Sequence, residues 1–365
     1  MHYFTFAEKD TTLYQNTGSM NTGLDEVLEI RKEVSDTGDT INVSRVLIRF
    51  DITQISASIV DGTITNPTYY LNLYDAKSSN LNISQSIYAY PVSQSWVMGQ
   101  GRSYDNPITT EGASWDYKDG ATDGSIWGEV SSSGGTWISG SGYEASQSLT
   151  HTTIDLRMDV TDIMNKWLSG SIANDGFMIK RQGDVGNLNT SLDEGSSTNF
   201  GHLSFFSSDT HTKYPPTLET VWNDSKWSTG SLSALTQANI EDMTIYMKGL
   251  RPEYKEKSKV RFRLVGRERF PDATYDTTPA NLSVKTLPSA SSYYSIVDAE
   301  TDEVVVPYGS GSLISCDSTG NYFNLWLDGY QPERYYRLEF RVQSGSGVDE
   351  IDQYFNEGFT FKVTQ

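Results

Sequence analysis

The residue types that most often do chemistry in proteins are scattered along this chain. None of its histidines has the H-x-H or H-x-x-x-H spacing that places two imidazoles on one metal ion. The chain also lacks a G-x-S-x-G turn for a serine nucleophile and a phosphate-binding P-loop. The sequence therefore argues against zinc, nucleotide and serine-hydrolase chemistry. The four histidines are His2, His151, His202 and His211. We expect His211 to lie in an exposed loop and His202 to be a satisfied histidine at a strand end.

Carboxylates are abundant, with 47 Asp and Glu residues. A glycosidase uses two of them, but such a pair is defined by its separation in space, which the sequence does not give. No motif singles out two members of this large set. We therefore predict no catalytic residues and no enzymatic activity.

The segment DYKDGATDG, residues 116–124, holds three aspartates in a loop. Calcium prefers several oxygen ligands from a flexible loop, and Asp116, Asp119 and Asp123 would supply them. Their offsets differ from those of an EF-hand, and Asp before Gly is ordinary turn chemistry. We interpret the segment as a turn and keep calcium binding as the alternative. No other cofactor is expected.

Aromatic residues are frequent between positions 96 and 137, in a segment rich in Gly and Ser. We expect Trp96 and Trp115 to lie in the core. For the others, three interpretations stay open: core packing, contact with a neighbouring subunit, where aromatic anchors carry much of the binding energy, or stacking on sugar rings. The candidate contact residues are Tyr104, Tyr117, Trp127 and Trp137.

Strands must position these residues, because alternation of apolar and polar residues recurs along the chain. In KVRFRLV, residues 259–265, the apolar side chains should face inward and Lys259, Arg261 and Arg263 outward. YYRLEFRV, residues 335–342, follows the same rule. Gly, Asn, Asp and Ser cluster between such segments, as expected of turns. Short strands without intervening helices predict β-sandwiches.

One stretch departs from this pattern and predicts a single short helix. In DVTDIMNKWLSGSIANDGF, residues 159–177, apolar residues recur at i, i+3, i+4, i+7 and i+8. We expect Asp159 to cap the helix start and Gly170 to end it. Trp167 and Leu168 should then plug one end of a sandwich. The helix is therefore interpreted as structural.

Composition limits the classes of partner. The chain has 365 residues, is 36% hydrophobic and carries a formal charge of −19. Such a surface repels a phosphate backbone, so no nucleic-acid partner is expected. No apolar run approaches the length that spans a bilayer, so we expect no membrane insertion. The single cysteine, Cys316, allows no intrachain disulfide and is predicted to be a buried, inert thiol.

The order of features in the first part of the chain resembles the DNRLRE-type domain, a jelly-roll sandwich related to carbohydrate-binding modules. The segments that carry this resemblance are LIRFDIT (47–53), YYLNLYDA (69–76), IYAYPVSQSW (87–96), GASWDYKDG (112–120), IDLRMDVTDIMNKWLSG (154–170), NDGFMIKR (174–181) and LSFFSSDTHTKYPPTLETVW (203–222). The resemblance covers about 200 residues, and the loops between Gly99 and Gly140 exceed what the family needs. It implies an all-β domain at 1–225 that contains the one helix.

The second part carries YYSIVDAETDEVVVPYG (293–309) and DSTGNYFNLWLDGYQPERYYRLEFRV (317–342). These segments resemble an immunoglobulin-like module found at the C-terminus of structural proteins of large tailed bacteriophages, notably marine ones. The resemblance implies a second β-sandwich at 236–365. Residues 226–235 lie in a Ser/Thr-rich stretch and are predicted to be a linker.

Together these features predict a non-catalytic bacteriophage structural protein. It would be a neck, collar or tail component, a fibre or a capsid decoration, present in many copies and bound to other virion proteins. The start, MHYFTFAEKDTT, lacks the basic and apolar regions of a signal peptide, which fits assembly in a bacterial cytoplasm before incorporation into the virion. The alternative is a carbohydrate-binding module or host-receptor adhesin that binds a host surface glycan.

Overall fold

Strands with alternating burial dominate the chain, and the predicted all-β, sandwich-like class is confirmed. The computed structural model describes residues 1–34, 41–79, 84–122, 124–128, 134–150, 155–183, 194–235, 243–270, 283–344 and 351–365. None of the described helices is long and apolar enough to cross a membrane.

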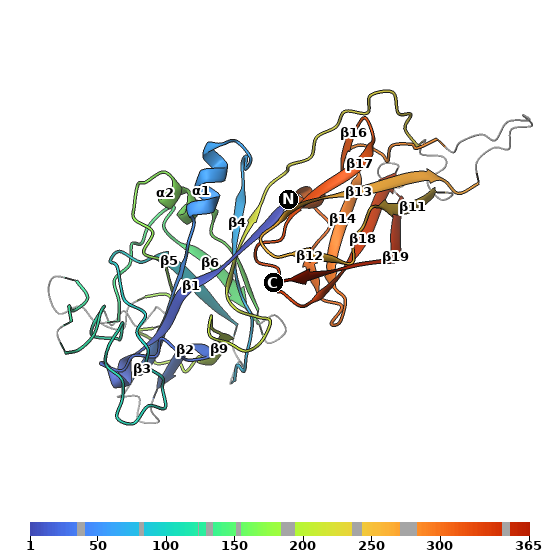
Figure 1. Ribbon diagram of the computed structural model, residues 1–365. Helices are drawn as coiled ribbons and strands as arrows, with labels where there is room; N and C mark the ends of the chain where they lie inside the picture. The colour runs from blue at the N-terminus through green and yellow to red at the C-terminus, as the bar shows by residue number, and fades with distance from the viewer. Residues whose placement is uncertain are drawn as a thin grey trace, which may run out of the picture. The chain divides into compact units, whose positions relative to one another are not determined.

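The first part of the chain contains ten strands, two α-helices and a short 3₁₀-helix in the described residues (Figure 1). Their bounds are β1 (His2–Tyr14), η1 (Gln15–Thr17), β2 (Val27–Val34), β3 (Ile41–Phe50), α1 (Thr53–Val60), β4 (Thr68–Leu73), β5 (Gln85–Pro91), β6 (Ala145–Leu149), β7 (Leu156–Asp159), α2 (Thr161–Leu168), β8 (Phe177–Lys180), β9 (Gly201–Phe206) and β10 (Thr217–Val221).

These strands pair in the order β6-β5-β8-β3-β1-β10-β4-β7, while β2 pairs with both β3 and β9. The β1–β3, β2–β3 and β2–β9 pairs are antiparallel. Strand β2 therefore has a hydrogen-bonded neighbour on each side, and its outward-facing residues form a rigid surface.

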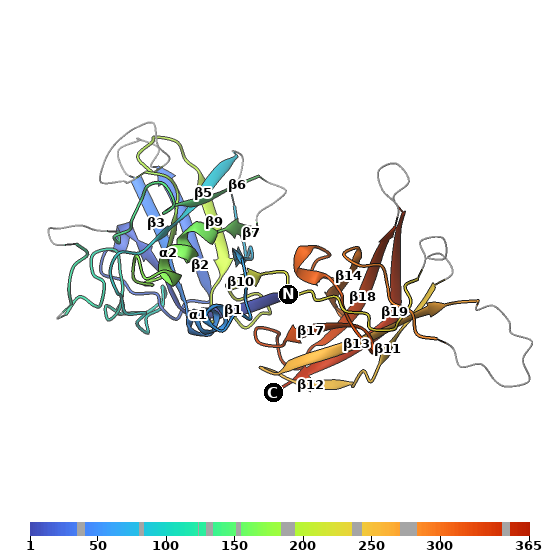
Figure 2. The same ribbon diagram turned by 90° about the horizontal axis from the view of Figure 1, so that it is seen from above.

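The remaining strands form two sheets. Their bounds are β11 (Met243–Lys248), β12 (Glu253–Lys255), β13 (Lys259–Glu268), β14 (Ser292–Asp298), β15 (Val304–Val306), η3 (Ser310–Ser312), β16 (Ser315–Asp317), β17 (Gly320–Trp326), β18 (Tyr335–Ser344) and β19 (Ile351–Thr364). One sheet has the order β11-β13-β17-β16 and the other β12-β19-β18-β14-β15. Figure 2 labels β11, β13 and β17 of the first sheet and β12, β14, β18 and β19 of the second.

An aromatic cluster joins these two sheets. The rings of Tyr294 and Phe323 lie 4.3 Å apart between centroids, and Phe340 lies 6.0 Å from Phe323. Of the residues predicted to face inward in the segments 259–265 and 335–342, Val260 is only half-buried. The others are buried, which confirms the alternation there: Phe262, Leu264, Tyr336, Leu338, Phe340 and Val342.

The described chain divides into two compact units. The N-terminal unit comprises Thr5–Ala57 and Thr68–Glu219, and the C-terminal unit comprises Met1–Phe4, Ser58–Pro67 and Thr220–Gln365. The first strand thus begins in the C-terminal unit.

These units differ from the predicted segments 1–225, 226–235 and 236–365 at their ends. Phe4 packs edge-on against Tyr330, with centroids 6.0 Å apart, in the core of the C-terminal unit. Leu235, in the predicted linker, is buried in the same core. Apolar contacts far apart in sequence therefore set the units.

The predicted helix is present as α2. Its first backbone N–H, on Thr161, donates to Oδ1 of Asp159 at 3.0 Å. Gly170 has a φ of +73°, the left-handed conformation that ends a helix at low cost with glycine. Trp167 is buried and its ring lies 4.6 Å from that of Phe177. These observations confirm the helix and the core position of Trp167, whereas Leu168 is only half-buried.

The prediction of a single helix is wrong, because α1 is a second one. Its start is fixed by Asp51, whose Oδ1 accepts hydrogen bonds from the backbone N–H of Thr53 at 2.9 Å and from its hydroxyl at 2.6 Å. The segment TQISASIV is only eight residues long and has two β-branched isoleucines, so its sequence also suits a strand. Tertiary contacts decide the outcome, since Ile55 is fully buried.

Two valines of β15 allow the effect of core packing on stability to be distinguished from the effect of strand propensity. Val306 is fully buried, whereas Val304 is 55% exposed. We expect Val306→Ala to lower the free energy of unfolding of the C-terminal unit by about 2 kcal/mol, because it removes buried methyl groups and leaves a cavity. Val304→Ala should change it by less than about 0.5 kcal/mol. Denaturant titrations that resolve this unit's transition test both values, and equal effects would contradict the assigned sheet faces.

Candidate binding site

Trp127 lies in the core of the N-terminal unit. None of its surface is exposed, and its indole N–H donates to the carbonyl oxygen of Ser114 at 2.8 Å. Trp96 and Trp115 are buried in the same cluster, where the sequence places them. In this structure, Trp127 therefore presents no face to a subunit or a glycan.

Trp137 is half-buried at the edge of this core. The guanidinium of Arg45 lies 4.9 Å from the centroid of its ring, and the ammonium of Lys180 lies 4.5 Å away. The ring of Tyr90 packs beside it, with centroids 6.3 Å apart. The Trp137 side chain thus covers buried cations.

The two candidate tyrosines have different surroundings. Tyr117 is half-buried and pairs with Ile126 in an isolated antiparallel bridge. Tyr104 is 71% exposed, and the guanidinium of Arg102 donates to its hydroxyl. Of the four predicted contact residues, Tyr104 is the one that lines the groove defined below.

The three predicted calcium ligands are only partly described. Asp116 donates its backbone N–H to the carbonyl oxygen of Gly18 at 2.9 Å. The Oδ1 atom of Asp119 accepts the backbone N–H of Ser125, which is turn chemistry. Asp123 lies outside the described residues. Within the described ranges, no three His, Cys, Asp or Glu side chains converge on a metal position. Calcium binding here stays a prediction.

The N-terminal unit carries a groove of about 480 Å³ with mixed polar and aromatic walls. One side is formed by the end of β1, η1 and β2, and the other by residues 102–104. Its lining residues are Tyr14, Asn16, Thr17, Met20, Leu24, Asp25, Glu26, Val27, Glu29, Arg31, Arg102, Ser103 and Tyr104.

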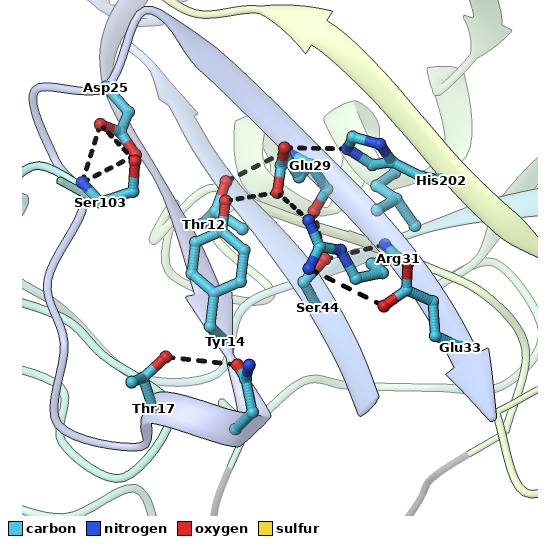
Figure 3. A network of polar contacts seen from close by, with 12 residues as sticks. Thr12, Tyr14, Thr17, Asp25, Glu29, Arg31, Glu33, Ser44, Ser103 and His202 are labelled. Carbon is cyan, nitrogen blue, oxygen red and sulfur yellow. Dashed lines mark hydrogen bonds and ion pairs between the residues drawn. The ribbon is translucent and has the colours of Figure 1, made fainter. Parts of the chain in front are cut away.

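Glu29 on β2 lines the groove and makes several of the polar contacts drawn in Figure 3. Its Oε2 accepts the Tyr14 hydroxyl at 2.8 Å and the Arg31 guanidinium at 3.2 Å. Its Oε1 lies 2.9 Å from Nε2 of His202 on β9. Burial alone would raise the pKa of Glu29, but the hydrogen bonds of His202 and Tyr14 and the charges of His202 and Arg31 lower it below its usual value. The carboxylate is therefore ionised at neutral pH.

The opposite wall is held to the β2 side of the groove through Asp25. The backbone N–H of Ser103 donates to the two carboxylate oxygens of Asp25 at 3.0 and 3.3 Å. The backbone N–H of Leu24 donates to the carbonyl oxygen of Gly101 at 2.9 Å. Burial raises the pKa of Asp25, and the hydrogen bonds from Ser103 partly offset this effect.

Asn21 fixes the loop that carries this wall. Its side-chain nitrogen donates to the carbonyl oxygens of Met98 and Ala113 at 2.7 and 2.8 Å. Its side-chain oxygen accepts the backbone N–H groups of Gly101 and Gly23 at 2.8 and 3.2 Å. Asn21 is fully buried, so this one side chain satisfies four backbone groups that water cannot reach.

Glycines make room for this arrangement. A Cβ added to Gly101 would lie 2.3 Å from the carbonyl oxygen of Asn21, and one added to Gly23 would lie 2.3 Å from that of Met98. Gly99 would meet the side chain of Asn21 and also has a φ of +80°. The loop therefore approaches Asn21 more closely than any larger residue allows.

A buried ion cluster supports the same unit from inside. Oε1 and Oε2 of Glu194 accept hydrogen bonds from Arg45 at 3.1 and 2.6 Å, and Nζ of Lys180 lies 3.2 Å from Oε2. Arg45 also donates to the carbonyl oxygen of Gly134 at 2.6 Å. All three charged side chains are at most 1% exposed. The ionised groups thus connect β3 and β8 with two loops.

Asp10 of β1 is a second buried carboxyl group. Its Oδ2 accepts the backbone N–H of Ser208 at 2.7 Å. The neighbouring Ser207 donates its backbone N–H to the carbonyl oxygen of Glu26 at 3.0 Å. Burial raises the pKa of Asp10 to about 7, against the opposing effect of the hydrogen bonds from Ser208. Asp10 therefore positions the segment that supports one end of the groove.

The side chain of His211 is 90% exposed, which confirms its sequence-based expectation. His202 lies near the start of β9, with its Nε2 atom 2.9 Å from Oε1 of Glu29. His151 lies outside the described residues, and His2 is buried. The thiol of Cys316 is buried and free, and burial raises its pKa to about 11.

Sequence reasoning did not find Glu29, Asn21 or Glu194. Glu29 sits in LEIRKEV, whose alternation could have indicated a polar strand face. Nothing in the local sequence around Asn21 distinguishes it from an ordinary turn residue, because its partners are about 80 to 90 positions away. Glu194 likewise pairs with Arg45 across 149 positions.

No family model matches the chain, and no curated protein does so either. Among solved structures, the chain is similar to a DUF4785 family protein from Legionella pneumophila, with 7% sequence identity and a TM-score of 0.19. The match covers 100% of this chain and 62% of that chain, so this chain spans less than two thirds of its length. A likeness this weak carries no argument about function.

Glu194→Gln tests the buried ion cluster. The change leaves Arg45 and Lys180 buried without this carboxylate, which should lower the free energy of unfolding of the N-terminal unit by about 3–5 kcal/mol. Glu33→Gln is the matched control, because Glu33 is 45% exposed and its contact with Arg31 is 3.8 Å long. The control should change stability by less than about 1 kcal/mol. Equal values in urea titrations would contradict the structural role of Glu194.

Asp10→Asn tests the buried carboxyl group through pH. The pKa of Asp10 is about 7 in the folded state and about 3.9 in the unfolded chain, so folding binds a proton between these values. Wild-type stability should therefore fall as pH rises from about 4 to 7. The neutral variant should lack this fall and be more stable than the wild type above pH 7, by up to roughly 4 kcal/mol.

Asp51→Asn is the control with the opposite sign. Hydrogen bonds from the hydroxyl and backbone of Thr53 lower the pKa of Asp51, so its contribution is present above the unfolded pKa and is lost as pH falls. The control should be less stable than the wild type at pH 7 and match it at low pH. Thermal unfolding from pH 3 to 8 measures both, and parallel curves for wild type and Asp10→Asn would contradict the assignment.

Proposed function

We propose that this chain is a non-catalytic structural protein that acts through contacts with other proteins. The observation that carries this proposal is the state of two of the three groove carboxylates, Glu29 and Asp25. Both oxygens of Glu29 are occupied by side chains of the protein, and Asp25 is held by Ser103. A general acid or nucleophile needs a free oxygen and a matched pKa, whereas Glu29 is a fixed, ionised acceptor. Such carboxylates fix the positions of neighbouring side chains and loops.

The setting we propose is a bacteriophage particle, in its neck, collar or tail, in a fibre or as a capsid decoration. The support is the sequence resemblance of residues 293–309 and 317–342 to a phage module. These segments form β14 to β18, which supply both sheets and much of the aromatic core of the C-terminal unit. The segments that carry the resemblance therefore belong to the folded core of the C-terminal unit.

Mass spectrometry of purified particles tests this setting. The chain should be present in many copies per particle and should co-purify with other virion proteins after mild disassembly. A quantified capsid protein provides the internal standard for copy number. Particles from the producing host that lack the chain would contradict the proposal.

The groove favours a second candidate function, the binding of a glycan. It combines an exposed aromatic ring, Tyr104, with the charged side chains of Arg102 and Glu26, and the Glu26 side chain is 54% exposed. Sites for small ligands share this combination of apolar surface and a few oriented polar groups. A sugar ring could stack on Tyr104 while its hydroxyl groups reach the charged side chains.

Tyr104→Ala tests this candidate. If a host surface polysaccharide binds in the groove, the change should weaken retention by about two- to tenfold, because it removes an aromatic face worth about 0.5–1.5 kcal/mol. Tyr335→Ala is the control, since Tyr335 is 48% exposed and lies in the C-terminal unit. Affinity electrophoresis measures retention. Equal retention of both variants, or no retention of the wild type, would contradict glycan binding in the groove.

A further inference from the structure

The outward face of the sheet β11-β13-β17-β16 is basic in an otherwise acidic chain. We name it the basic face. Because side chains alternate along a strand, the residues of β13 that do not enter the core point outward, together with every second residue of β11. The residues that define it are Tyr246, Lys248, Lys259, Arg261, Arg263 and Arg267.

Register brings these side chains together. Lys248 lies opposite Arg263 in the β11–β13 pair, and Arg263 lies opposite Tyr322 in the β13–β17 pair. The guanidinium carbons of Arg261 and Arg263 lie 4.2 and 5.7 Å from the centroid of the Tyr322 ring. The face is therefore a continuous surface of cations and aromatic rings across three strands.

The carboxylate of Asp317 forms ion pairs with two of these cations. Asp317 lies 2.8 Å from Arg263 and 3.8 Å from Arg261. Within the described residues, it is the acid that pairs with both. The hydrogen bonds of Arg263 hold the pKa of Asp317 well below its usual range, so it stays ionised and neutralises a single charge. The basic face thus keeps a net positive charge.

The charge contrast within the chain is large. Residues 243–270 contain nine Lys or Arg and three Glu, whereas the whole chain has 28 Lys or Arg and 47 Asp or Glu. The N-terminal unit, Thr5–Ala57 and Thr68–Glu219, has 13 Lys or Arg and 26 Asp or Glu. A basic face and an acidic unit on one chain provide complementary surfaces for two copies.

We propose that the basic face binds the acidic N-terminal unit of a second copy of this chain, so that copies associate head to tail. This inference rests on the proposed function, which requires many copies in one assembly. Tyr246 is 42% exposed and the Arg261 side chain 50%, and Tyr and Arg are the residues enriched at the energetic centres of protein interfaces. In a head-to-tail contact, the basic face of one copy binds the acidic unit of the next, so further copies can add and the assembly grows into a ring or a filament.

Charge favours a second copy over nucleic acid. A phosphate backbone and a second copy of this chain are both strongly negative, and each would have to approach a molecule with a formal charge of −19. At physiological salt, charges more than about 8 Å away are screened, but adjoining acidic side chains would still repel a long polyanion. The acidic unit of another copy can present its carboxylates to the basic face at selected positions only.

Sedimentation of the full chain tests the proposal. At 50 mM NaCl, self-association of the wild type should increase with protein concentration. At 300 mM NaCl, the dissociation constant should be about tenfold larger. The double variant Lys248→Glu/Arg261→Glu should bind at least about thirtyfold more weakly. The control, Lys255→Glu/Lys257→Glu, changes the net charge equally at exposed lysines outside both the basic face and the acidic N-terminal unit, and should bind like the wild type.

Several outcomes would overturn the proposal. A wild type that stays monomeric at every concentration would overturn it. Equal weakening of self-association in the double variant and in the control would do the same. Because Arg261 contacts Asp317, the single variant Lys248→Glu serves as the second test, with thermal unfolding as the check of its fold. Binding of a fluorescent DNA oligonucleotide that only the face variant loses would assign the basic face to a polyanion instead.

The particle experiment separates this inference from the proposed function. Many copies in particles together with a monomeric wild type would contradict the head-to-tail contact alone. Salt-sensitive self-association of a chain that is absent from particles would contradict the virion setting alone.

Discussion

The groove of the N-terminal unit depends on one buried amide. Asn21 satisfies four backbone groups, on Met98, Ala113, Gly101 and Gly23, and thereby closes a long loop onto the turn that precedes β2. Each of those groups would be costly to bury unpaired, by about 1–3 kcal/mol. Without this amide, residues 102–104 would be held to the rest of the groove mainly by the hydrogen bonds of Asp25 with Ser103 and of Leu24 with Gly101.

The polar side chains of the unit follow the same logic, because their partners lie within the protein. Glu29 accepts from Tyr14 and pairs with His202, while Glu194 neutralises Arg45. Buried charges that are paired in this way fix the relative positions of strands and loops. This use of acidic groups supports the proposed structural role.

The sequence was sufficient for features that depend on local periodicity. The inward faces of β13 and β18 and the helix α2 could be predicted because a strand alternates with period two and a helix with 3.6. The helix α1 was missed because its short segment suits either state. The full burial of Arg45 could not be predicted, since its partner Glu194 lies 149 positions away. Long-range pairs of this kind leave no local signal.

Hydrogen exchange at the backbone N–H of Gly101 tests the central role of Asn21 most directly. This N–H donates to the Asn21 side chain, and in the wild type it should exchange as slowly as the strand amides of the same unit. In Asn21→Ala it should exchange at least about a hundredfold faster, while the amide of Ile48 in β3 keeps its protection. Equal exchange rates at Gly101 in both proteins would show that the loop holds its position without this side chain, and would contradict the account.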